Sequence, residues 1–259
     1  MPDIFEDARR ALARGQEHAR DVETELRQFH ESHPYALVDE HDTKNRRIDR
    51  HLRVKRPPKR AAELACDAVN NFRMALDRAL YAIASSTGAL NTSDERYVRD
   101  VRFPIEGDRA SFEQALGGKY KYLPENVRAL LATVEPYARG KGSLLWSLNR
   151  IGNINKHRLL VPVRVTDATV ATAGFMEAPP LLSAVEDKIA YATQSDRVEP
   201  NDGVHVTLNI SFDDPEVECP LSLLGFLHEV SHTIEDILNR LEALAVHDGY
   251  TRRNRASDR

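Results

Sequence analysis

The chain has 259 residues, of which 41% are hydrophobic and 29% charged, a balance typical of a soluble globular protein with a sizeable core. It contains no apolar run near the roughly 20 residues that cross a bilayer, and its charged N-terminus does not resemble a secretory signal. We therefore expect a cytoplasmic protein without membrane contact. Two distant cysteines, Cys66 and Cys219, argue against a disulfide framework or a cysteine zinc site.

The net charge of -4 conceals a basic segment. Residues 43–60 contain nine Lys or Arg and a single acid, Asp49, so the rest of the chain is acidic. A local basic segment on an acidic protein can bind phosphates. The alternative is a solvated hairpin surface without a ligand.

The first half of the chain predicts two long helices separated by a hairpin. Residues 3–31 have helical apolar spacing, with Asp3 as the expected N-cap and Glu6 completing a capping box. Two short strands, 35–38 and 48–54, flank a polar turn and predict a β-hairpin. Residues 59–85 carry a wide apolar stripe typical of a buried helix.

The second half predicts shorter helices, then strands, then a final helix. We expect irregular structure over 86–108, helices over 111–116 and 125–137, and another helix that begins near Ser143. Strands are expected at 159–165, 168–175, 185–192 and 204–212, with a turn at Thr166–Asp167. Residues 221–246 predict a long helix, and 251–259 a disordered tail.

These elements predict one α+β domain over residues 1–250. A helical bundle would occupy 3–157 with an inserted β-hairpin, an antiparallel sheet would occupy 158–215, and the helix 221–246 would pack back on the bundle.

A dense polar cluster lies where helical periodicity changes to strand-like alternation, within residues 144–165. If the helix continues through Lys156, Arg150 and His157 are two turns apart on one side. An arginine can hold a phosphate and a nearby histidine can move a proton near neutral pH, which suits RNA cleavage. Alternatively, the cations Arg150, Lys156 and Arg158 favour a helix C-terminus, and the cluster is an architectural joint.

A second candidate is the HExxH sequence formed by His228, Glu229 and His232. Histidines four apart on a helix can share a zinc ion, and the glutamate can act as a general base for a zinc-dependent hydrolase. The alternative is a solvent-exposed helix face.

The helix expected over 59–85 also contains two polar pairs at helical spacing. Asp67 lies four residues before Asn71, close to the apolar stripe, and Arg73 lies four before Asp77, where an ion pair can form. We expect Asp67 and Asn71 to hydrogen-bond with the segment from Asn153 to His157, because polar groups near a core need partners.

The sequence resembles a group of uncharacterised, largely actinobacterial helical proteins. The resemblance rests on D-x-x-x-N-x-R-x-A-L-D, here Asp67 to Asp77, and on N-x-[DN]-K-H-R, here Asn153, Asn155, Lys156, His157 and Arg158. The spacing from Arg150 to His157 is similar to the R-x4-6-H signature of HEPN domains, helical bundles that include metal-independent ribonucleases. The residue after that arginine is commonly polar in HEPN domains and is Ile151 here.

The HEPN resemblance implies an RNA-binding or RNA-cleaving protein, often a homodimer, that needs no cofactor. From this resemblance only Arg150 and His157 are carried over, as catalytic residues. The candidate binding or supporting residues are Asp67, Asn71, Asn153, Asn155, Lys156 and Arg158. Two other classes remain open from the residues themselves: a structural or interaction protein without catalysis, and a zinc hydrolase.

Overall fold

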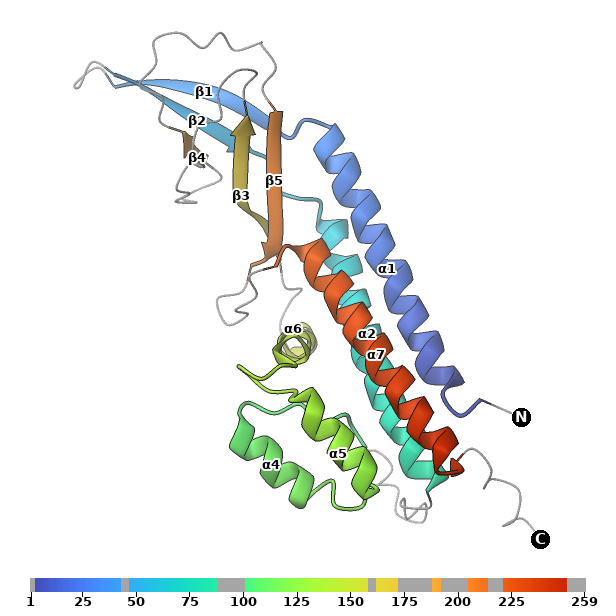
Figure 1. The fold of residues 1–259 in the computed structure, drawn as a ribbon. Coiled ribbons are helices and arrows are strands. Elements are labelled where there is room, and N and C mark those ends of the chain that lie inside the picture. The colour runs from blue at the N-terminus through green and yellow to red at the C-terminus, as the bar shows by residue number, and fades with distance from the viewer. Residues whose placement is uncertain are drawn as a thin grey trace.

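The computed structural model describes residues 3–42, 47–87, 101–157, 162–171, 188–191, 205–213 and 221–250. Within them the fold is α+β, as the sequence predicts. Three long helices form the bundle: α1 (Glu6–Glu31), α2 (Lys59–Ser86) and α7 (Leu223–His247). Figure 1 shows them side by side, with strands at one end and the shorter helices along one flank.

The three long helices bury their apolar stripes against one another. The stripe of α2 is wide enough to contact neighbours on several sides, and it packs on α1, α7 and α6. Its fully buried residues include Phe72, Leu76, Leu80 and Ile83. On α7, Leu227, Val230, Ile234 and Leu238 face the same core.

Close approach of α1 and α2 depends on Gly15. A glycine in the middle of a helix usually lowers the stability of that helix. In the structure, a Cβ added at Gly15 would lie 2.5 Å from Cδ1 of Phe72 and 3.3 Å from the carbonyl oxygen of Ala68. The missing side chain therefore makes room for a fully buried aromatic ring.

The start of α1 differs from the predicted capping box. The helix begins at Glu6, three residues later than expected, and Asp3 Oδ1 accepts a hydrogen bond at 2.9 Å from the backbone N–H of Phe5. Phe5 is almost completely buried. The turn over residues 3–5 thus allows the ring of Phe5 to enter the core.

The predicted hairpin is present as β1 (Tyr35–Asp42) and β2 (Arg47–Val54). It projects beyond the bundle, and its base is closed by the N–H of Lys55, which donates to the carbonyl of Pro34 at 2.7 Å. The strands are antiparallel, and the register sets Asp39 opposite Arg50.

The later strands divide between two sheets, whereas the sequence predicts one. Strand β4 (Lys188–Tyr191) pairs with β2, so the hairpin becomes a sheet of order β1-β2-β4. Strands β3 (Val163–Ala171) and β5 (His205–Phe212) form a separate antiparallel pair. Alternation of apolar and polar residues predicts that a strand forms. The strand with which it pairs depends on which sheet edge lies nearby in space.

The expected turn at Thr166–Asp167 is a bulge within the single strand β3. The register with β5 shifts between Val165 and Asp167. The hydroxyl of Thr166 lies 3.2 Å from that of Ser211 on β5, so the polar residue stays in the sheet. Residues 172–175, expected to extend this second strand, lie outside the described residues.

Shorter helices complete the described fold: α4 (Arg109–Gly117), α5 (Glu125–Val134) and α6 (Ser143–His157). The carboxylate of Asp108 caps α4 by accepting from the N–H of Ser111 at 2.9 Å. Helix α5 ends three residues before the predicted Tyr137. Pro136 disfavours a helical residue before it, and Glu135 leaves the helix in a left-handed conformation, φ 51°.

Residues 88–100 of the expected irregular segment and the expected tail over 251–259 lie outside the described residues. Among the helices that are described, none combines the length and apolarity required to span a membrane.

We expect Gly15→Ala to lower the free energy of unfolding by about 1–3 kcal/mol, because the added methyl group overpacks the core against Phe72. Urea denaturation measures the change. Gly117→Ala is the control: a Cβ there meets no atom within 4 Å, so stability should be unchanged or raised by up to about 1 kcal/mol. Equal effects of the two substitutions would contradict the packing role of Gly15.

Candidate functional site

Helix α6 carries the polar cluster that the sequence singles out. It runs without a break through His157, so Arg150 and His157 lie on one helix, about 10 Å apart along its axis. Leu145, Leu148 and Ile151 are fully buried and fix this helix in the core. Packing in the core therefore explains why the residue after Arg150 is the apolar Ile151.

The polar residues of α6 lie next to these buried positions, and several of them are partly buried themselves. Asn149, Arg150 and Asn155 are half-buried, and Asn153 is exposed. The backbone of Lys156 and His157 belongs to the last turn, but their side chains lie outside the described residues, as does the whole of Arg158. The pairing of Arg150 with His157 thus stays a prediction.

Helix α6 crosses α2 at Gly152. A Cβ there would lie 3.7 Å from Val69 Cγ1 and 4.0 Å from Asn70 Oδ1, which is ordinary contact distance. The crossing point is therefore flanked by the predicted partners Asp67 and Asn71. However, Nδ2 of Asn71 donates to the carbonyl of Asp67 in its own helix, at 2.8 Å, and Asp67 is exposed. A shared hydrogen-bonded site between the two motifs stays a prediction.

Arg73 and Asp77 form a clamp on the chain entering α4. Their side chains are 3.2 Å apart and only 12% and 28% exposed. Nη2 of Arg73 donates to the carbonyl of Phe103 at 2.9 Å, and Asp77 Oδ1 accepts from the N–H of the same residue at 2.8 Å. This ion pair thus satisfies both backbone groups of a buried residue.

Burial determines the electrostatics of this clamp. Desolvation lowers the pKa of Arg73, and the carboxylate of Asp77 acts in the opposite direction. Burial also raises the pKa of Tyr120, so its phenol stays neutral beside the pair. The sequence identifies the i,i+4 spacing of the pair, but not the backbone that it binds.

The HExxH residues lie on the exposed side of α7. The Nε2 atoms of His228 and His232 are 3.0 Å apart, and the rings meet edge to face with centroids 4.5 Å apart. Both rings line a cavity of about 690 Å³ together with Glu229 and, from α1, Gln16, Arg20 and Glu23. None of the described side chains of α6 lines this cavity.

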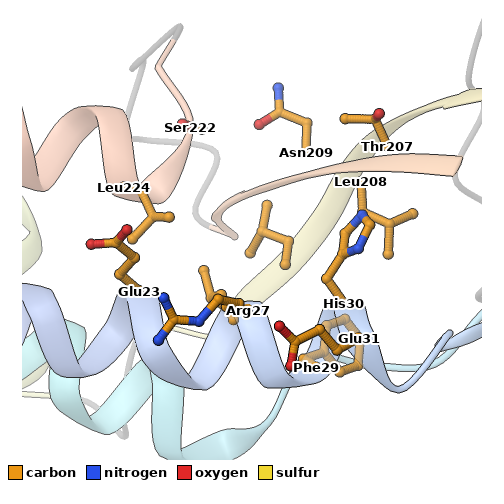
Figure 2. Close-up of a pocket in the computed structure, with 12 residues that line it drawn as sticks. Glu23, Arg27, Phe29, His30, Glu31, Thr207, Leu208, Asn209, Ser222 and Leu224 are labelled. Atoms are coloured by element: carbon orange, nitrogen blue, oxygen red, sulfur yellow. The ribbon is translucent and has the colours of Figure 1, made fainter.

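A neighbouring cavity of about 760 Å³ shares Glu23 and Leu224 with the histidine cavity. Figure 2 shows that its walls come from the last turns of α1, from β5 and from the start of α7. Leu26, Phe29, Leu208 and Ile210 give it an apolar interior. The ionisable lining residues are Glu23, Arg27, His30 and Glu31. Such a lining suits an amphipathic ligand. Sequence patterns did not indicate it, because its walls come from three distant segments.

Part of the basic segment lies in strand β2 of the hairpin. The backbone register sets Arg50 opposite Asp39 and Arg47 opposite Asp42. At the junction with α2, by contrast, five side chains are all exposed: Arg53, Lys55, Arg56, Lys59 and Arg60. Lys59 and Arg60 approach Glu63 at 4.0 and 3.7 Å, which are long, exposed ion pairs. We call these five residues the basic junction.

Comparison of this chain with protein-family models, curated proteins and solved structures finds no match. The candidate functions therefore depend on the chemistry of the residues described above.

We expect Asp77→Ala to destabilise the protein by about 2–4 kcal/mol, because it leaves a largely buried guanidinium and the N–H of Phe103 unpaired. Chemical denaturation measures this change. The double variant Arg73→Met/Asp77→Ala should regain part of the stability, since it removes the unpaired charge.

The matched control for this pair is Arg109–Glu113, which has the same i,i+4 spacing but side chains 74% and 61% exposed. Glu113→Ala should cost less than about 1 kcal/mol, because solvent screens an exposed pair. Destabilisation of similar size at Asp77 and Glu113 would contradict the role of the clamp.

Proposed function

We propose that the protein binds RNA through the basic junction and cleaves it, without a metal ion, through Arg150 and His157. The observation that carries the proposal is the group of five exposed cations at 53–60, within a chain whose net charge is negative. Polyanion binding draws its affinity from such local cations, because each neutralised phosphate releases a counterion.

The ion pairs around the basic junction are compatible with phosphate binding. Glu63 is the carboxylate that approaches Lys59 and Arg60, and its contacts are long and exposed. Exposed pairs of this kind contribute at most about 1 kcal/mol, so a phosphate can replace the carboxylate at little cost. The backbone register sets Asp39 and Asp42 of β1 opposite Arg50 and Arg47, which are not part of the basic junction.

The helix that carries the proposed cleavage residues, α6, meets α2 in the half of α2 that begins at the basic junction. Helix α6 crosses α2 at Val69 and Asn70, ten residues beyond Lys59 and Arg60, which is about 15 Å along the helix. A short single strand of RNA is long enough to contact both. In this proposal Arg150 holds a phosphate while His157 accepts the proton of the attacking ribose 2′-hydroxyl. As the new P–O2′ bond forms, the P–O5′ bond breaks to give a 2′,3′-cyclic phosphate, and the leaving 5′-oxygen takes a proton from water.

The resemblance to HEPN domains adds a homodimer to the proposal. A second chain would place two copies of the Arg150–His157 helix in one assembly. Light scattering after size exclusion measures the mass of the assembly, and a monomer would remove this part of the proposal without affecting RNA binding.

The RNA-binding part is tested by replacing Lys55, Lys59 and Arg60 with glutamine together. We expect the Kd for a single-stranded RNA to rise at least tenfold at low salt. The slope of log K against log salt should fall by about 0.7 for each phosphate that the variant no longer neutralises. Fluorescence anisotropy at several salt concentrations measures both quantities.

The control is a second triple variant in which Arg109, Lys121 and Lys141 become glutamine. These exposed cations lie outside the basic junction, and the change in net charge is identical. RNA binding should be nearly unchanged. Equally weakened binding in the two triple variants would mean that net charge, and not the junction, determines affinity.

The cleavage part is tested with His157→Ala. We expect RNA cleavage to fall by about 10²–10⁴-fold with an unchanged RNA Kd, because the substitution removes proton transfer but not the basic junction. Cleavage by the unaltered protein should persist in EDTA. His247→Ala, an exposed histidine at the end of α7, is the control. Cleavage that survives in His157→Ala, or that EDTA abolishes, would contradict the proposal.

A further inference from the structure

The histidine pair of α7 plays no part in the proposed RNA chemistry, and its geometry is unusual for two exposed side chains. The Nε2 atoms of His228 and His232 point at each other at 3.0 Å, although solvent is available to both rings. As a hydrogen bond this arrangement requires one ring to donate and the other to accept. An exposed bond of this type adds little to stability.

The same arrangement is close to that of two ligands on one metal ion. Zinc binds imidazole nitrogen at about 2.0–2.1 Å, so two ligands at a tetrahedral angle are about 3.3 Å apart. The observed separation differs from this value by a few tenths of an ångström. A small rotation of either ring therefore gives both nitrogens access to one ion.

The backbone beneath the pair is held rigidly. Leu227, Val230 and Ile234 are buried in the core on the other side of α7. Beside the pair, Nε2 of Gln16 on α1 donates to the hydroxyl of Ser231 at 3.1 Å, which links the two helices. The two rings thus project from a fixed helix face, and rigid presentation lowers the entropic cost of binding a ligand.

The charged residues around the pair are acidic on balance. The carboxylates of Glu23, from α1, and Glu229, from α7, line the same cavity as the histidines, together with one guanidinium, that of Arg20. Among the residues that the structure describes, no three His, Cys, Asp or Glu side chains are grouped closely enough to hold an ion. Water would therefore fill the remaining positions, as in open zinc sites and unlike closed structural ones.

We propose that His228 and His232 form a two-histidine site for a divalent transition-metal ion of the zinc class. Imidazole ligands select ions such as Zn²⁺, Ni²⁺ and Cu²⁺ over Mg²⁺ and Ca²⁺, which prefer oxygen. The site is open to solvent on one side, and the described residues that line it come from α1 and α7.

The test is a calorimetric titration of the full chain, without a polyhistidine tag, with Zn²⁺. We expect a single ion to bind per chain, with Mg²⁺ giving no signal. His228→Ala and His232→Ala should each weaken binding at least tenfold, because the second ligand of a chelate acts at high effective concentration. Both side chains are exposed, so the variants should fold.

The control His247→Ala removes another exposed histidine of α7 and should leave Zn²⁺ affinity unchanged. Bound Cu²⁺ should show two nitrogen ligands by electron paramagnetic resonance, and fewer in either single variant. The proposal is overturned if the unaltered protein binds no Zn²⁺ saturably, or if the double variant His228→Ala/His232→Ala binds it with unchanged affinity. RNA binding should be the same in all these variants, so the two proposals can fail independently.

Discussion

Phe72 of α2 packs against the backbone of α1 at Gly15, and this contact sets the distance between the two helices on which the rest of the fold is built. Because α1 and α2 are connected through the hairpin, their close approach also brings Pro34 and Lys55 together, where a backbone hydrogen bond of 2.7 Å closes the base of the hairpin. The five cations of the basic junction lie in the chain at residues 53–60, around that base. A core contact thus determines where positive charge is displayed.

The third helix is tied to α1 by polar contacts along its length. Near one end, Nε and Nη2 of Arg9 bind both carboxylate oxygens of Glu242 at 2.7 and 2.8 Å. Further along, Gln16 reaches Ser231. These contacts hold α7 with one face in the core and the adjacent face, which carries His228 and His232, beside α1. The same helix is both a structural member of the bundle and the support of a candidate metal site.

Two polar motifs of the sequence have different roles in the fold. Arg73 and Asp77 bind the backbone of Phe103, so they act as a joint between α2 and the segment leading to α4. Asn71 is bound within α2 itself. Arg150 and Asn153 belong to α6, which crosses α2 at Gly152. A polar group at helical spacing can therefore be architectural, and only its partners distinguish it from a functional one.

The sequence by itself determined the α+β class, the three long helices and the hairpin, because these depend on apolar periodicity and turn residues that act locally. It also placed His228 and His232 on one helix face. Only the tertiary structure decided that β4 joins β2, that Thr166 lies in a bulge, and that Gly15 is a contact site rather than a weak point. The same is true of the clamp on Phe103 and of the cavity between α1, β5 and α7. The reason is physical: each of these features joins residues far apart in the chain, and periodicity within one element carries no information about which distant surface it will meet.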